Sequence, residues 1–233
     1  MKIALDAMGG DFAPQAAIQG AINTLKKTKD KIHIIIVGDE NQIKSELGDS
    51  IPDHISIHHT TQIVTMNDTS SKVLKRKPDS SIVQGIKLVK DQKADAFISA
   101  GHTGAVMATS LFLLGRIPHV KRPALGAYLP TISGGKILCD VGANPDAKPI
   151  HLLQFAIMAS MYLDHVEGIK DIKVGLINIG AEPTKGSKMY LETFDLLKKE
   201  LPNFIGNVES RNLFDCEANV LVCDGFVGNT LIK

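Results

Sequence analysis

The chain has 233 residues, of which 44% are hydrophobic and 22% charged, a composition typical of a globular protein. Its formal net charge of +1 excludes the strong overall field that draws proteins to nucleic acid or anionic lipid, so we expect no nucleic-acid partner. This length is sufficient for a sizeable buried core, and we treat residues 1–233 as a single α/β domain.

The cysteine pattern and the apolar segments indicate a cytoplasmic protein. Cys139, Cys216 and Cys223 are odd in number and lack CxxC spacing, which favours a reducing compartment, and no metal-ligand spacing is found, so we expect no metal. The beginning MKIALD has no apolar segment typical of a secretory signal. The most apolar stretches, 105–114 and 152–163, are shorter than the roughly 20 residues of a membrane span.

In chain order, short β-branched segments alternate with segments of helical periodicity. Ile18, Ala21, Ile22 and Leu25 recur at the spacing of one helix face, which predicts an amphipathic helix over 14–27. For the first half of the chain we predict, in order, a strand at 2–7, this helix, a strand at 33–37, a short helix ending at Leu47, a strand at 55–59, a helix beginning at 78–81, a strand at 94–99 and an apolar helix beginning at 101–104.

The second half continues the alternation. The predicted elements are strands at 123–131 and 136–141, a helix at 149–166, a strand at 173–179, a helix at 187–200 and a strand at 219–223. The turn Ser133-Gly134-Gly135 predicts an arm or antiparallel excursion near 123–141, and the whole pattern predicts an α/β fold with a mostly parallel, doubly wound sheet. Because the last strand is followed by only the start of a helix, we expect a further carboxyl-terminal portion.

Five predicted loops share one design, in which an apolar strand leads into small residues and then a helix. They are DAMGGD at 6–11, SAGHTG at 99–104, DVGAN at 140–144, NIGAEPTKG at 178–186 and DGFVGN at 224–229. Glycine lets backbone N–H groups approach an anion, and such loops meet at the carboxyl ends of parallel strands. We therefore predict a site for phosphate or a similar anion. Neither GxGxxG nor GxxxxGK[ST] is present, so no nucleotide-binding fingerprint is indicated.

A set of seven motifs adds a family resemblance. In order they read MKIALDAMGGDFAP, SAGHTGAVMA, RPALGAYLPT, DVGANPDAKP, NIGAEPTKG, FIGNVESR and VCDGFVGN. Together they resemble the phosphate acyltransferase of bacterial phospholipid synthesis, over essentially the whole chain. The resemblance implies transfer of a fatty acyl group from acyl carrier protein to inorganic phosphate, giving acyl phosphate without an organic cofactor.

The same resemblance implies a three-layer αβα sandwich similar to phosphotransacetylases and to isocitrate and isopropylmalate dehydrogenases. It also implies a homodimer, peripheral membrane association and a chain that extends beyond the present carboxyl end. Two positions depart from the pattern: His102 stands where the family more commonly has Asn, and Asn219 where an acidic residue is more usual.

Attack of phosphate on a thioester requires groups that bind phosphate, hydrogen-bond donors for the developing oxyanion and correct orientation of both reactants. We predict His102, Lys185 and Asn229 as catalytic residues, while a helix cap for His102 and a solvated lysine for Lys185 are the structural alternatives. Cys139 and Cys223 are better explained as buried strand residues than as nucleophiles. The predicted substrate-binding or phosphate-binding residues are Gly9, Gly10, Asp11, Gly101, Thr103, Gly104, Asn144, Lys148, Gly186, Asp224 and Gly228.

Three other functions remain open. A phosphotransacetylase performs the same chemistry on acyl-CoA, whereas a carrier-protein enzyme should present a basic docking surface, for which Arg116, Lys121 and Arg122 are candidates. An isopropylmalate-type NAD-dependent dehydrogenase requires acidic metal ligands and an adenine pocket, and a non-catalytic binding module would keep the loops only as turns. For assembly, 152–163 is apolar on nearly every face, so we predict that this helix or the arm at 128–137 lies in a homodimer interface.

Overall fold

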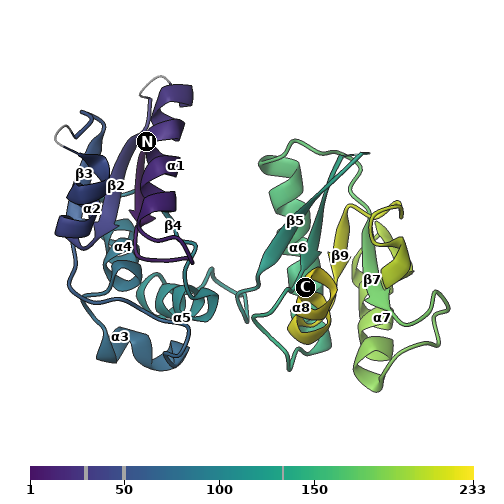
Figure 1. The fold of residues 1–233 in the computed structure, drawn as a ribbon. Coiled ribbons are helices and arrows are strands. Elements are labelled where there is room, and N and C mark those ends of the chain that lie inside the picture. The colour runs from purple at the N-terminus through teal and green to yellow at the C-terminus, as the bar shows by residue number, and fades with distance from the viewer. Residues whose placement is uncertain (29–30, 49–50, 133) are drawn as a thin grey trace. The chain divides into compact units, whose positions relative to one another are not determined.

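The computed structural model describes residues 1–28, 31–48, 51–132 and 134–233. These residues form two compact units, Met1–Gly115 (unit 1) and Arg116–Lys233 (unit 2). Each unit has its own sheet (Figure 1), whereas the sequence pattern predicts a single domain. The predicted α/β class with mostly parallel strands is confirmed, because every strand pair except the one at the edge of unit 2 is parallel.

Unit 1 is built on a four-stranded parallel sheet in the order β3-β2-β1-β4. Its elements are β1 (Lys2–Asp6), α1 (Gln15–Thr28), β2 (His33–Gly38), α2 (Glu40–Leu47), β3 (Ile55–His59), the 3-10 turn η1 (Ser70–Lys72), α3 (Val73–Arg76), α4 (Ser81–Lys90), β4 (Ala96–Ile98) and α5 (Thr103–Leu113). Alternate residues of β2 face opposite layers: Ile34 and Ile36 pack with α1 and α2, and Ile35 and Val37 with α4. Helices thus cover both faces of the sheet, as a parallel sheet requires.

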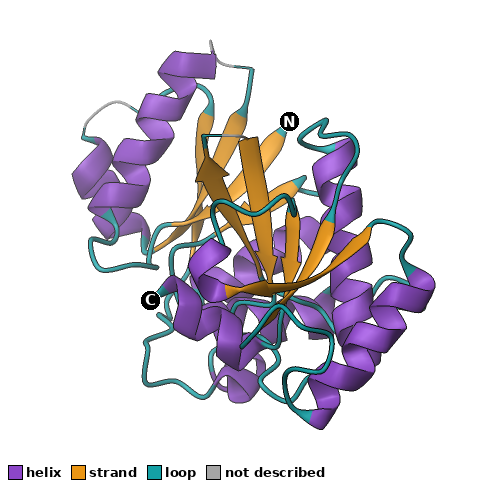
Figure 2. Ribbon diagram, turned by 90° about the vertical axis from the view of Figure 1, so that its right-hand side faces the viewer, coloured by secondary structure: helices purple, strands orange, loops and turns teal. Residues whose placement is uncertain are grey.

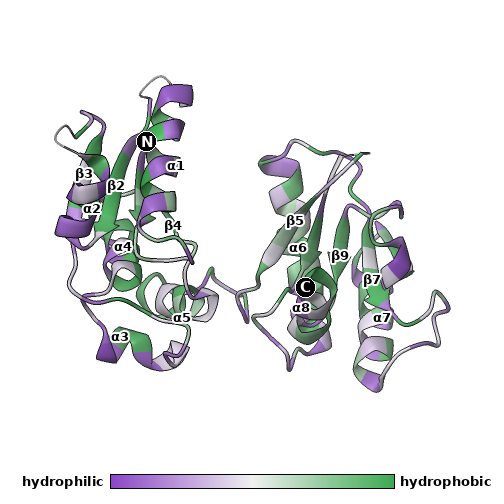
Figure 3. Cartoon of the chain, in the orientation of Figure 1, coloured by the Kyte–Doolittle hydropathy of each residue, from purple (hydrophilic) through white to green (hydrophobic). Residues whose placement is uncertain are grey.

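Unit 2 contains a five-stranded sheet in the order β5-β6-β9-β7-β8, with β5 antiparallel at its edge. Its elements are β5 (Gly126–Thr131), β6 (Gly134–Cys139), α6 (Pro149–His165), β7 (Val174–Asn178), α7 (Lys188–Glu200), β8 (Phe204–Glu209), the 3-10 turn η2 (Ser210–Asn212), β9 (Val220–Val222) and α8 (Gly225–Ile232). One face packs on α6 and α7, and the other on α8 and the segment after β8. Figure 2 shows the strands in orange among the purple helices, and Figure 3 colours much of the strand ribbon green, for hydrophobic residues.

Local sequence explains most of these elements. The predicted stripe on α1 is confirmed, since Ile18, Ala21 and Leu25 are buried. The predicted turn residue Ser133 lies outside the described residues, between β5 and β6. The sequence pattern does not predict strand β8, because Gly206 interrupts its apolar residues. In the structure Gly206 has a φ of 109°, and the register between β7 and β8 is irregular beside it.

Helix α6 is buried on one side and exposed on the other. Leu152, Phe155 and Leu163 are fully buried against the sheet, whereas Met161 and Tyr162 are 55% and 45% exposed. No helix within the described ranges is long and apolar enough to cross a bilayer.

Candidate functional site

In unit 1 the buried carboxylate of Asp6 joins the ends of β1 and β4. Its Oδ1 accepts a hydrogen bond from the N–H of Met8 at 2.9 Å, and its Oδ2 accepts one from the hydroxyl of Ser99 at 2.6 Å. The Ser99 hydroxyl oxygen in turn accepts from the N–H of Gly101 at 3.0 Å. A Cβ at Gly9 would lie 2.6 Å from both Asp6 Oδ2 and the Gly101 nitrogen, so the two loops meet with no room for a side chain.

Free backbone donors gather at this corner. In the part of the chain that the structure describes, no acceptor is found for the N–H groups of Gly9, Gly10, Thr103 and Gly104. Thr103 and Gly104 open α5, where the helix dipole adds positive potential. Asp11 is exposed one residue beyond Gly10. The predicted residues of unit 1 therefore fall in one region, with N–H groups available to an anion.

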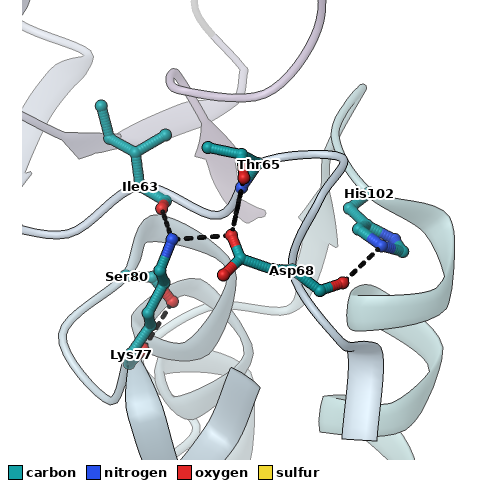
Figure 4. Close-up of polar contacts among 6 residues, drawn as sticks. All are labelled: Ile63, Thr65, Asp68, Lys77, Ser80 and His102. Carbon is teal, nitrogen blue, oxygen red and sulfur yellow. Dashed lines mark hydrogen bonds and ion pairs between the residues drawn. The ribbon is translucent and has the colours of Figure 1, made fainter. Parts of the chain in front are cut away.

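His102 caps α5 with its ring (Figure 4). Nδ1 accepts from the N–H of Ala105 at 3.4 Å, and Nε2 lies 3.2 Å from the carbonyl oxygen of Asp68. Because a carbonyl only accepts, Nε2 carries the hydrogen and Nδ1 has none. Both ring nitrogens are occupied, and the ring fastens the segment before η1 to the start of α5.

An ion pair anchors that segment. The Oδ2 of Asp68 accepts from Lys77 Nζ at 2.6 Å, from the Thr65 N–H at 2.7 Å and from the Thr65 hydroxyl at 2.9 Å. The hydrogen bond from Lys77, followed by that from the Thr65 N–H, holds the pKa of Asp68 at about 2. Lys77 Nζ also donates to the Ile63 carbonyl at 2.6 Å (Figure 4). Sequence reasoning assigned no site role to Asp68 or Lys77, because neither belongs to a recognisable motif.

In unit 2, Asp140 organises the loop that follows β6. Its Oδ1 accepts from the N–H groups of Leu125 at 3.0 Å, Gly142 at 3.3 Å and Ala143 at 3.1 Å. Its Oδ2 accepts from the backbone N–H of Asn144 at 2.7 Å and from the side-chain amide at 2.8 Å. Three successive loop N–H groups are thus bound to this buried carboxylate and are not free to hold an anion.

Asp224 has a similar role at the end of β9. Its Oδ1 accepts from the N–H groups of Phe226 at 2.9 Å and Val227 at 3.0 Å, which caps α8. Its Oδ2 accepts from the hydroxyl of Tyr190 at 2.6 Å. Burial, together with this hydrogen bond, raises the pKa of Tyr190. The geometry therefore makes Asp224 a cap and a link to α7.

The loops after β6 and β9 pack closely. A Cβ at Gly228 would lie 1.9 Å from the carbonyl oxygen of Asp140, and one at Gly142 would lie 3.8 Å from the Asn229 side chain. Asn144 is held to Asp140 by the bonds described above. The structure thus brings the predicted residues Asn144, Asp224, Gly228 and Asn229 to one corner of unit 2.

Lys185 and Gly186 lie in the loop after β7, the strand beside β9. The Asn178 amide shapes this loop, since Nδ2 donates to the Lys185 carbonyl at 3.0 Å. Gly186 has a φ of 101°, and a Cβ there would lie 2.8 Å from Asn178 Oδ1. The Lys185 side chain is exposed, and within the described ranges its ammonium has no acidic partner. No hydrogen bond or ion pair among these residues joins it to Asn144 or Asn229.

A hollow of about 960 Å³ lies at the start of α6 in unit 2, and we call it the basic hollow. Its wall consists of Arg116, His119, Lys121, Arg122, Lys148 and His151, completed by Ile117, Pro118 and Val120. No acidic residue is part of this wall. Over the described residues, none of its lysines or arginines forms an ion pair. Lys148 therefore shares one surface with the predicted docking residues Arg116, Lys121 and Arg122.

The side-chain amide of Gln154 on α6 holds the wall in place. Its Oε1 accepts from the Lys121 N–H at 2.8 Å, and its Nε2 donates to the His119 carbonyl at 2.9 Å. Arg116 Nη1 donates to the Lys121 carbonyl at 2.6 Å. These hydrogen bonds thus hold the segment from Arg116 to Arg122 against α6, and none of them pairs its positive charges with an acidic group.

Two cysteines are in surroundings that suppress thiolate formation. Cys139 and Cys223 are buried strand-end residues. Burial, with Asp140 as the second cause, raises the pKa of Cys139 to about 12, and burial raises that of Cys223 as well. Neither thiol has the low pKa that nucleophilic cysteines require.

Comparison with known proteins places the chain in a family. The model of the family described as "Fatty acid synthesis protein" matches residues 1–233. The phosphate acyltransferase of Halothermothrix orenii is 49% identical over 237 residues, covering 100% of this chain and 71% of the relative. Phosphotransacetylases from Streptococcus pyogenes and Staphylococcus aureus have a similar fold, with TM-scores of 0.68 and 0.66 at 16% and 18% identity. Each comparison covers 99% of this chain and 79% of the solved one. The chain therefore belongs to the fatty acid synthesis protein family, and curated phosphate acyltransferases are its relatives.

Proposed function

We propose that this protein transfers a fatty acyl group from acyl carrier protein to inorganic phosphate, giving acyl phosphate for phospholipid synthesis. The observation that carries this proposal is the 47–49% identity with curated phosphate acyltransferases along the whole chain. The fold shared with phosphotransacetylases supports the reaction class, transfer of an acyl group between a thiol carrier and phosphate.

The proposed step balances without a covalent enzyme intermediate. A phosphate oxygen attacks the thioester carbonyl carbon, the new C–O bond forms, the C–S bond breaks, and the thiolate leaves and takes up a proton. A thiolate is a good leaving group, and the raised pKa of Cys139 and Cys223 argues against either as a nucleophile. Catalysis then depends on holding phosphate and stabilising the oxyanion.

The free N–H groups of the loop after β1 and of the start of α5 are our candidates for the phosphate site in unit 1. They belong to Gly9, Gly10, Thr103 and Gly104, and four N–H groups suit the oxygens of a phosphate. The occupied ring nitrogens of His102 favour a role in shaping this region over proton transfer. In unit 2, Lys185 is proposed to contact the anionic reactant and Asn229 to serve as a neutral donor.

The finer properties of the protein are also proposals. Acyl carrier protein is proposed as the donor from the family resemblance, and the basic hollow offers a surface for an anionic partner. A homodimer is proposed through the exposed apolar side of α6, where Ile157 and Met161 lie. A cytoplasmic location with peripheral membrane association follows from the family resemblance.

The decisive experiment measures thiol release from long-chain acyl carrier protein with and without inorganic phosphate. We expect release only with phosphate, and much slower release when acyl-CoA is the donor. Thiol release that is independent of phosphate, or none with any acyl chain, would contradict the proposal. A rise in melting temperature with NAD but not with phosphate would favour the dehydrogenase alternative.

A further inference from the structure

We propose that the basic hollow binds a phosphate ester on the organic arm of the thioester donor, chiefly through Arg116, Lys121 and Arg122, none of which is among the predicted inorganic-phosphate residues. This inference rests on the proposed function, because it identifies how the donor is held. The ligand class is a phosphate monoester or diester attached to a flexible thiol-bearing arm, the part that acyl carrier protein and coenzyme A have in common.

The charges of the hollow require a partner. Arg116, Lys121, Arg122 and Lys148 surround one concave surface that contains no acidic side chain. Like charges gathered in this way repel one another, and in a purely structural arrangement acidic neighbours would offset them. Guanidinium groups present planar pairs of donors that match phosphate oxygens. A bound phosphate group relieves the repulsion and uses these donors.

The size and the remaining lining indicate an organic ligand rather than inorganic phosphate alone. About 960 Å³ is near the upper end of the range of roughly 300–1,000 Å³ typical of small-molecule sites. Ile117, Pro118 and Val120 give the wall an apolar portion beside the cations. A bare phosphate ion would leave most of this volume and all of this apolar surface without contact.

The hollow is also held ready for a ligand. Gln154 ties the backbone of Lys121 and the backbone of His119 to α6, so binding does not have to order this segment. Lys148 and His151 line the hollow from the N-terminal end of the 17-residue helix α6, whose dipole adds positive potential. The ordered wall, the positive charges and the direction of α6 thus all favour an organic ligand that carries a phosphate group.

His151 reports on the occupancy of the hollow. Its Nδ1 accepts from the Lys148 N–H at 3.1 Å. Burial, then the charges of Arg122, Lys148 and Lys121, lower the pKa of His151. A phosphate group bound among these cations offsets their field and therefore raises the pKa of His151 towards its ordinary value.

The test compares two probes that differ only in the phosphate. Isothermal titration of the full protein should show 4′-phosphopantetheine binding at least about tenfold more tightly than pantetheine, since a charge-assisted contact is worth roughly 1.5–3 kcal/mol. The double substitution Arg116→Gln, Lys121→Gln should weaken 4′-phosphopantetheine at least about tenfold and leave the affinity for inorganic phosphate within about twofold. The matched control, Lys198→Gln with Lys199→Gln, removes two charges from the end of α7 and should change neither affinity.

Equal binding of the two probes, or equal binding by the double variant and the wild type, would overturn the inference. So would a parallel loss of affinity for inorganic phosphate, which would make the hollow the site of the acyl acceptor. Titration of the His151 ring by NMR provides a readout in the unmodified protein: 4′-phosphopantetheine should raise its pKa, and pantetheine should not. Phosphate-dependent thiol release, measured on the same preparation, tests the proposed function separately from binding at the hollow.

Discussion

The hydroxyl of Tyr190 on α7 donates to Oδ2 of Asp224, the residue that caps α8, over a distance of 2.6 Å. The same hydroxyl oxygen accepts from the Asp224 N–H at 3.3 Å. Both side chains are buried, so one phenol satisfies a carboxylate that water does not reach freely. This pair joins α7 to the cap of α8 at the carboxyl end of β9.

Tyr190→Phe should therefore destabilise the fold. The change leaves a buried carboxylate oxygen without its donor, which costs about 1–3 kcal/mol in the free energy of unfolding. Urea denaturation followed by circular dichroism measures this loss. Tyr162→Phe is the matched control, because Tyr162 is 45% exposed and its hydroxyl lies 3.4 Å from Glu167. Equal urea midpoints for the two variants would contradict a stabilising role for the hydrogen bond from Tyr190 to Asp224.

The low pKa of Asp68 predicts a specific acid sensitivity. Its pKa is about 2 in the folded protein against 3.8 for the free side chain, so the unfolded chain binds the proton more readily. The stabilisation is complete above about pH 4 and is lost as the pH falls towards 2. Asp68→Asn should lower the melting temperature at pH 7 and reduce its dependence on pH between 4 and 2. Parallel melting curves against pH for wild type and variant would contradict this.

Gly228 should tolerate no side chain. Gly228→Ala places a Cβ 1.9 Å from the backbone oxygen of Asp140, and we expect a loss of about 1–3 kcal/mol or more. Gly20→Ala is the opposite control, since nothing lies within 4 Å of that Cβ on α1, and it should stabilise by about 1 kcal/mol. Thermal unfolding of both variants checks the pair. A stable Gly228→Ala protein would show that the two loops are not closely packed.

His102→Asn should be mild in its effect on kcat/KM. Nδ1 of His102 caps α5 and Nε2 contacts the Asp68 carbonyl, and an Asn amide also offers a donor and an acceptor. We expect a loss of less than about tenfold in phosphate-dependent thiol release. A loss beyond about a thousandfold, with the melting temperature unchanged, would instead make His102 a general acid.

Lys185→Ala should weaken the use of phosphate while leaving the fold intact. The Lys185 side chain is exposed, so its removal disturbs no packing. Loss of one charge-assisted contact predicts a decrease of about ten- to a hundredfold in kcat/KM for phosphate. Lys188→Ala is the control, as Lys188 is an exposed neighbour whose Nζ lies 3.9 Å from Glu192. An unchanged KM and kcat for Lys185→Ala would remove Lys185 from the site.

The order of most helices and strands, though not β8, and the positions of the glycine-rich loops were determined by the sequence alone. The stripe of Ile18, Ala21 and Leu25 encodes one buried helix face, and small residues after each apolar segment mark the ends of parallel strands. The ordered motifs indicated the family, which the comparisons confirmed. These signals are local, because periodicity and turn chemistry act over a few residues.

Only the tertiary structure decided how the loop donors are used. Asp140 and Asp224 bind the N–H groups of the loops after them, whereas the N–H groups of Gly9 and Gly104 meet no acceptor among the described residues. The division into two sheets and the union of Arg116 to Arg122 with Lys148 at one hollow were likewise not encoded locally. Hydrogen bonds and electrostatic fields depend on distances in space, and residues far apart in the chain acquire those distances only when the sheets and helices pack.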